Sequence, residues 1–138
     1  MENIGCRIRL GYPRPKDSLV RVFQGMPVAN IDDCMGRMAA MDQGLWPMNR
    51  HPLLGTAFTI RVPQGDNLMV HKGMDLAQPG DVLVIDAGGC CNRAILGELM
   101  VRYCQCRGIQ GIVVDGAVRD RDALEQAGIP VYCRAVTP

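Results

Sequence analysis

The chain has 138 residues, 15 of them basic and 14 acidic, and 48% of its residues are hydrophobic while only 4% are aromatic. This length and composition predict one domain with a substantial core. The sequence has no basic run with interleaved aromatic residues, which argues against nucleic acid as a partner. It also has no stretch near the roughly 20 apolar residues that a membrane span needs, which argues against a membrane partner. Since the N-terminal sequence MENIGCRIRL lacks a signal-peptide core, we expect a cytoplasmic protein.

The N-terminal half of the chain predicts short elements separated by turns. Residues 1–16 contain two glycines and two prolines and predict an irregular lead-in. Asn30 is a suitable N-cap residue and Asp33 stands at the capping-box position, which predicts a helix over 31–38. The other elements expected here are a helix over 18–23, a loop over 44–52, a strand over 56–62, a turn over 63–66 and a helix over 67–77.

The stretch over 80–120 predicts a strand–helix–strand unit around which the chain is organised. Apolar runs over 82–85 and 112–114 each end at an aspartate, as is typical of strands that are buried on both faces. Between them lies a helical pattern, closed by a glycine, with apolar residues at Leu96, Leu99, Met100 and Tyr103. This spacing is that of a βαβ unit. A short helix over 122–127 and a strand over 130–134 are expected after it.

The seven cysteines have two interpretations. An odd number argues against a closed disulfide framework. Cys90 and Cys91 are adjacent and Cys104 and Cys106 stand two apart, so neither pair has the C-x₂-C spacing of a zinc site. They form either a redox or metal site, or a set of small structural thiols in a reducing compartment, and the spacing favours the second interpretation.

Gly88-Gly89 and the two histidines also have a structural and a functional interpretation. The two glycines either form a turn that needs positive φ or bring the backbone close to an anion. His51 and His71 stand singly, as surface or packed histidines do. No Ser–His or Cys–His spacing supports nucleophilic catalysis.

Polar residues gather where the expected strands end and helices begin. Glu98 lies near the start of the central helix, whose first-turn N–H groups favour a carboxylate or phosphate. Arg119 suits bidentate capture of a keto acid, and Asp120 is a hard oxygen ligand for Mg²⁺ or Mn²⁺. Because open α/β sheets bind ligands at the carboxyl ends of their strands, these residues suggest a metal-assisted reaction on a small anionic substrate. The alternative is a surface Arg–Asp pair with a first-turn glutamate that the helix dipole favours.

Six short motifs stand out along the chain. They are Asn30-Ile31-Asp32-Asp33, Leu54-Gly55-Thr56-Ala57, Pro79-Gly80-Asp81-Val82-Leu83-Val84, Gly97-Glu98-Leu99-Met100, Asp115-Gly116-Ala117-Val118-Arg119-Asp120 and Thr137-Pro138. Together they resemble the family of 4-hydroxy-4-methyl-2-oxoglutarate aldolases and regulator of ribonuclease E activity A-like (RraA-like) proteins. The resemblance covers the chain from about Phe23, and the spacing from Glu98 to Arg119-Asp120 fits the family pattern of an acidic residue, twenty residues and Arg-Asp.

The resemblance implies a fold, a reaction and a role for each site residue. The fold is α/β, a layered β/β/α swivelling-type domain with a βαβ core, assembled as a homotrimer with active sites between subunits. The implied reaction is metal-dependent cleavage of a 4-hydroxy-2-oxo acid to pyruvate through its enolate, with oxaloacetate decarboxylation as a side activity. The implied catalytic residues are Glu98, which positions metal-bound water, Arg119, which holds the keto acid, and Asp120, which coordinates the divalent cation. The substrate carboxylate is received by Gly97, Glu98, Leu99 and Met100.

The resemblance also implies that the chain stops before the family's C-terminal strands. We therefore expect a single domain over 1–138 that lacks its last part, with an exposed sheet edge that favours self-association. The alternatives to an aldolase are a non-enzymatic regulator that binds a ribonuclease or another protein partner, and an inactive fragment. The menaquinone methyltransferase label that similar sequences carry has no support from a glycine-rich cofactor loop.

Overall fold

A computed structural model describes residues 6–138; the first five residues of the expected lead-in lie outside the described part. Residues 6–16 carry no helix or strand. The elements, in chain order, are α1 (Asp17–Arg21), α2 (Val28–Cys34), β1 (Trp46–Pro47), β2 (Thr56–Arg61), α3 (Leu68–Leu76), β3 (Asp81–Leu96), α4 (Glu98–Cys106), β4 (Gly111–Val118), α5 (Arg121–Glu125), β5 (Val131–Cys133) and β6 (Ala135–Val136).

The strands form one sheet in the order β1-β5-β4-β3-β2, with β6 also paired to β4. Strands β2, β3, β4 and β5 run parallel, and only β1 is antiparallel to its neighbour. Strands β5 and β6 pair with the two ends of β4, and the amide of Arg134 between them donates to the carbonyl of Gly116 over 2.9 Å. Strands β5 and β6 therefore follow one another along the same side of β4, with a break at Arg134.

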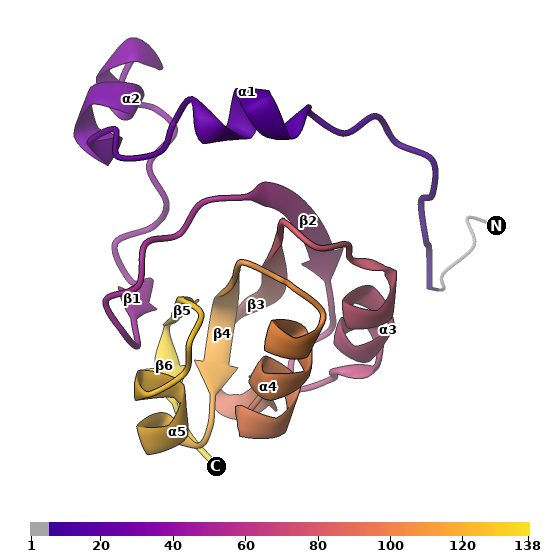
Figure 1. Cartoon of the computed structure of the whole chain (residues 1–138). Coiled ribbons are helices and arrows are strands. Elements are labelled where there is room, and N and C mark those ends of the chain that lie inside the picture. Colours follow the sequence, from indigo (N-terminus) through magenta and orange to yellow (C-terminus); the bar gives the residue numbers. More distant parts are fainter. Residues whose placement is uncertain (1–5) are drawn as a thin grey trace, which may run out of the picture.

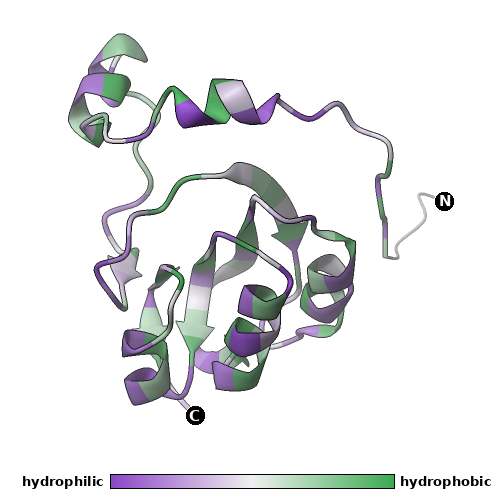
Figure 2. Ribbon diagram, viewed as in Figure 1, coloured by the Kyte–Doolittle hydropathy of each residue, from purple (hydrophilic) through white to green (hydrophobic). Residues whose placement is uncertain are grey.

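Three helices cover one face of this sheet. Helices α3, α4 and α5 each connect two parallel strands and lie side by side in front of the sheet (Figure 1). Hydrophobic and hydrophilic residues alternate along these helices (Figure 2), and buried apolar side chains include Val70 of α3, Val101 of α4 and Leu124 of α5. The core between them includes the fully buried side chains of Leu83, Ile85, Ile112, Val114 and Leu124. The α/β class and the βαβ core predicted from the sequence are confirmed, and both β3 and β4 are largely buried along their first halves.

The Pro-Gly-Asp motif places a buried carboxylate at the start of β3. Asp81 is fully buried, accepts a hydrogen bond from the amide of Gln78 over 2.8 Å and forms an ion pair with Arg14. The pair fixes the N-terminal segment to the sheet. Gly55 lies so close to this turn that a Cβ on it would stand 2.6 Å from the carbonyl oxygen of Gly80. A larger residue at position 55 would therefore separate β2 from β3.

Strand β3 is much longer than the sequence predicted. It continues past Asp86 to Leu96, with register shifts in its pairing to β4 after Asp86, Cys90 and Ala94. Gly88 and Gly89 have φ of 65° and 66°, so they need the positive φ that the structural interpretation required. The residues after Asp86 bulge out of the hydrogen-bond ladder, and β3 resumes its pairing with β4 at Cys90. Leu96, assigned to the helix from its spacing, is in fact a buried strand residue.

The N-terminal helices also differ from the prediction. Helix α2 begins at Val28 with Pro27 at its N-cap position, so Asn30 is inside the helix and does not cap it. Helices α1 and α2 contain no buried residue and lie apart from the sheet (Figure 1). The two-residue strands β1 and β6 were not predicted, because so short a pairing has no periodicity. In the part of the chain that the structure describes, no helix has both the length and the apolar character needed to cross a membrane.

Candidate active site

The candidate site lies where β3 and β4 end beside the first turn of α4. Gly97 is the N-cap residue of α4 and has extended backbone, with φ of −145°. The turn that carries Arg119 and Asp120 is fixed to this point, because the amide of Arg119 donates to the carbonyl of Leu96 over 3.0 Å. Two segments that are separated by more than twenty residues in the sequence therefore meet at the carboxyl edge of the sheet.

Asp120 occupies the centre of this junction. Its φ and ψ are 61° and 48°, a left-handed conformation that is uncommon for residues other than glycine but that aspartate tolerates. Its carboxylate accepts a hydrogen bond from the backbone amide of Glu98 over 2.9 Å, and its Oδ2 lies 3.7 Å from the Nε of Arg119. The conformation costs of the order of 1 kcal/mol and directs this carboxylate onto the start of α4.

Gly97 provides the space for this approach. A Cβ at position 97 would stand 2.5 Å from Oδ2 of Asp120 and 3.0 Å from Nε of Arg119. Because its backbone is extended, any residue could adopt the φ of Gly97. Glycine is required here because a side chain would collide with Asp120 and Arg119. The first residue of the Gly-Glu-Leu-Met motif thus lets both side chains of the Arg-Asp pair lie against the helix start.

Two adjoining cavities share Arg119. The smaller, of about 100 Å³, is lined by Asn67, Ala94, Ile95, Leu96, Gly97, Leu99, Met100 and Arg119. The larger, of about 440 Å³, is lined by Arg119, Asp120, Val136, Thr137 and Pro138. Leu99 and Met100 belong to the first turn of α4, where backbone N–H groups have no partner within the helix. The structure thus brings together five of the six residues predicted for the site: Gly97, Leu99, Met100, Arg119 and Asp120.

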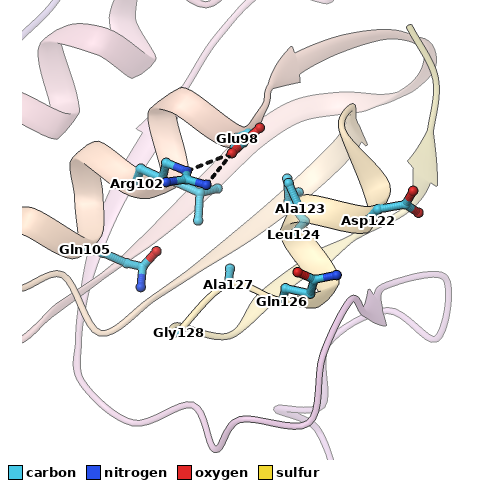
Figure 3. A pocket seen from close by; sticks show the side chains of 10 residues that line it. Glu98, Arg102, Gln105, Asp122, Ala123, Leu124, Gln126, Ala127 and Gly128 are labelled. Carbon is cyan, nitrogen blue, oxygen red and sulfur yellow. Dashed lines mark hydrogen bonds and ion pairs between the residues drawn. The ribbon is translucent and has the colours of Figure 1, made fainter.

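The side chain of the sixth residue, Glu98, has a different partner. Its carboxylate accepts hydrogen bonds from Arg102, one turn along α4, with an N–O distance of 2.7 Å. Figure 3 shows this pair beside a cavity of about 480 Å³ between α4 and α5. The amide of Glu98, which the sequence offered to a substrate anion, is already taken by Asp120. The amides of Leu99 and Met100 in the first turn, and that of the N-cap residue Gly97, are left for that role.

A divalent cation fits this arrangement if water supplies most of its ligands. Among the described residues there is no group of three or more histidine, cysteine or acidic side chains that could hold a metal ion. Asp120 is 42% exposed and uses Oδ2 for the Glu98 amide, which leaves its other carboxylate oxygen available. Mg²⁺ is commonly held by one or two carboxylates, several waters and substrate oxygens. The oxygen donor therefore fits Mg²⁺ or Mn²⁺, and a closed zinc-type site is not formed.

Three of the seven cysteines agree with a structural role, whereas Cys6, Cys34, Cys91 and Cys106 are exposed. Cys90, Cys104 and Cys133 are buried and unpaired. Burial raises the pKa of the Cys104 thiol to about 12 and also raises the pKa of the Cys133 thiol, so both stay protonated at neutral pH. A protonated thiol is a poor nucleophile and a poor metal ligand.

Two contacts of the site were absent from the sequence interpretation. Arg102 was not considered, although its position four residues after Glu98 is the spacing of a helical ion pair. Asn67, which lines the small cavity, lies at the start of α3 and carries no local signal of this contact. It reaches the site only because α3 packs beside α4 on the same face.

A family model and several relatives named as aldolases match the chain. The family model RraA-like, described as Aldolase/RraA, matches residues 28–138. A protein of Halalkalibacterium halodurans with the provisional name 4-hydroxy-4-methyl-2-oxoglutarate aldolase is 40% identical over 116 residues, which are 83% of this chain and 55% of that protein. The chain spans about half the length of the aldolase-named relatives that it matches.

Two solved structures of RraA proteins share the fold. Streptomyces coelicolor RraAS2, described as an unusual member of the RNase ES inhibitor RraA family, has a TM-score of 0.77 at 30% identity, covering 91% of this chain and 67% of that one. The RNA-processing inhibitor RraA from Thermus thermophilis has a TM-score of 0.74 at 30% identity, covering 81% of this chain and 68% of that one.

Proposed function

We propose, from the premise that the chain belongs to the RraA-like family, that it is a carbon–carbon lyase that cleaves 4-hydroxy-4-methyl-2-oxoglutarate-type acids to pyruvate with a divalent cation. The observation that carries this proposal is the convergence of Arg119 and Asp120 on the start of α4, where Gly97 leaves room for both. The aldolase names of its relatives support it. Oxaloacetate decarboxylation follows as a side activity, because it passes through the same enolate.

The residues of the small cavity would bind and orient the keto acid. The amides of Leu99 and Met100 receive its carboxylate, since they are without helical partners and lie at the positive end of the α4 dipole. The guanidinium of Arg119, which borders both cavities, holds the keto oxygen and stabilises negative charge on it as the bond breaks. The remainder of the substrate extends past Asp120 into the larger cavity.

Asp120 would hold Mg²⁺ or Mn²⁺ through its available carboxylate oxygen. When bound, the cation supplies Lewis-acid stabilisation of the pyruvate enolate. Glu98 would position a water for proton transfer, and for this its carboxylate has to leave Arg102. That exchange is accessible, because an exposed i,i+4 pair contributes only about 0.5 kcal/mol. We also propose a homotrimer, as the family resemblance implied.

A second candidate function is protein regulation without catalysis. It is favoured by the two RraA structures, which are described as inhibitors of RNA processing and of RNase ES. A regulator has no need for a metal ion or for the Arg–Asp geometry. The two candidates are therefore separated by whether the chain turns over a keto acid at all.

The test is pyruvate release from 4-hydroxy-4-methyl-2-oxoglutarate and from oxaloacetate, followed with lactate dehydrogenase and NADH. We expect turnover with Mg²⁺ or Mn²⁺, loss of at least about 100-fold in excess EDTA, since the cation contributes several kcal/mol, and recovery when the metal is restored. Zn²⁺ at equal concentration is the control, because it carries the same charge but favours nitrogen and sulfur ligands over oxygen. Full turnover in metal-free buffer would contradict the metal-dependent mechanism, and no turnover under any condition would favour the regulator.

A further inference from the structure

We propose that the open edge of β2 is a binding groove for an extended acidic peptide, which joins the sheet as an additional strand. The proposal concerns a surface formed by the N-terminal segment, β2 and α3, and it does not depend on the proposed enzymatic function. Peptide recognition by strand addition combines backbone hydrogen bonds with side-chain selection.

Strand β2 offers backbone groups at regular spacing. Within the described part of the chain β2 pairs only with β3, so its other side is an edge. The amides of Thr56 and Val62 donate to β3, to the carbonyls of Gly80 and Asp86. Because parallel strands alternate the direction of these groups, the amides and carbonyls of the residues between, Ala57, Thr59 and Arg61, point to the open edge. All three residues are exposed.

A cavity of about 400 Å³ runs along this edge. It is lined by five consecutive residues of β2, from Ala57 to Arg61, together with part of α3 and the N-terminal segment. The N-terminal segment is held in place by the Arg14–Asp81 ion pair and by the ring of Tyr12, which lies 6.4 Å from that of Phe58. The groove therefore has a strand on one side and a tethered segment near the other.

The lining selects an anionic partner. Its apolar part consists mainly of Phe58, Ile60, Met69 and Leu76. Its charged residues are Arg7, Arg9, Arg61 and Lys72, with no carboxylate among the lining residues. Arg61 already pairs with Asp86 over 2.7 Å, while no ion pair is formed by Arg7, Arg9 or Lys72 within the described residues. An added strand turns alternate side chains to opposite faces, so a segment in which apolar residues alternate with Asp or Glu fits both the floor and the charge.

The decisive variant is Thr59→Pro. It removes one outward amide and leaves the bonds to β3, and proline is tolerated at edge positions whose N–H faces solvent. The matched control is Thr59→Ala, which keeps the amide. Binding of a labelled Glu-Val-Glu-Val-Glu-Val peptide is measured by fluorescence anisotropy, with the Lys-Val-Lys-Val-Lys-Val peptide as charge control, and folding is checked by circular dichroism.

We expect the acidic peptide to bind the native chain and Thr59→Ala alike, and to bind Thr59→Pro about tenfold more weakly, as the loss of one backbone hydrogen bond implies. The lysine peptide should not bind. If Thr59→Pro fails to fold, Lys72→Glu in the groove is compared with Lys16→Glu outside it, and only the former should weaken binding. The proposal would be overturned if the acidic and the lysine peptides bound equally, or if the two variants of a matched pair bound the acidic peptide with equal affinity. It would also be overturned if light scattering showed that the chain self-associates and that the peptide does not compete with this self-association.

Discussion

Replacement of Asp120 by asparagine is expected to reduce pyruvate release by about 1,000-fold while the fold is retained, because several kcal/mol of stabilisation by the cation are lost with the carboxylate charge. Asparagine tolerates the left-handed backbone that Asp120 adopts. Its side-chain oxygen can still accept the hydrogen bond from the Glu98 amide. The variant thus removes a charge without removing the contact that joins the β4–α5 turn to α4.

The measurement is kcat and KM for both substrates, with thermal unfolding as the check on structure. The matched control is Asp122→Asn, a first-turn carboxylate of α5 that lies two residues away. We expect the control to keep its activity within about twofold, since an exposed first-turn charge contributes well under 1 kcal/mol. Native turnover in Asp120→Asn would show that this carboxylate does not hold the cation.

Replacement of Arg119 by lysine is expected to lower kcat/KM by about 100-fold, although the charge is kept, because a misplaced contact at the reacting group costs about that much. Arginine presents a planar fork that can bridge the keto oxygen and the neighbouring carboxylate oxygen, and lysine presents a point charge. The side chain is 62% exposed, so little of the fold rests on it.

Arg121→Lys is the control for this change. Arg121 is 67% exposed and pairs with Glu125 on the surface of α5, so exchanging it tests the substitution without touching either cavity. Kinetics of Arg119→Lys that match those of Arg121→Lys would mean that Arg119 forms only a surface pair, which was the alternative interpretation of the sequence.

The sequence predicted the parts of the fold in which apolar residues follow a regular strand or helix pattern. Apolar runs of β-branched residues identified residues 82–85 of β3 and 112–114 of β4, each near the start of its strand, and the break at Pro79-Gly80 located the start of β3. The second half of β3 was not predicted as a strand, because its residues bulge out of register at Gly88-Gly89 and follow neither strand nor helix periodicity. Leu96 then continued the spacing of the helix by coincidence.

The sequence indicated which residues form the candidate site, but not the contacts that they make with one another. The motif spacing indicated Arg119 and Asp120, and the prediction that Glu98 lies near the start of the central helix was confirmed. The capping of the Glu98 amide by Asp120 could not be predicted, because it arises where the β4–α5 turn packs on α4. For the same reason the need for space at Gly97 is a tertiary requirement. The Glu98–Arg102 pair is local, and its four-residue spacing would have been sufficient to predict it, but the prediction did not include it.

The central claim is that Asp120 holds a divalent cation beside a bound keto acid. It is tested most directly by Mn²⁺ binding, followed through the loss of the free-ion signal in electron paramagnetic resonance, with oxalate present as a planar mimic of the pyruvate enolate. We predict that the native chain binds Mn²⁺ and that oxalate tightens this binding, whereas Asp120→Asn binds at least about tenfold more weakly, as a lost carboxylate ligand implies. Equal Mn²⁺ binding by the native chain and by Asp120→Asn, or no binding by either, would contradict the claim.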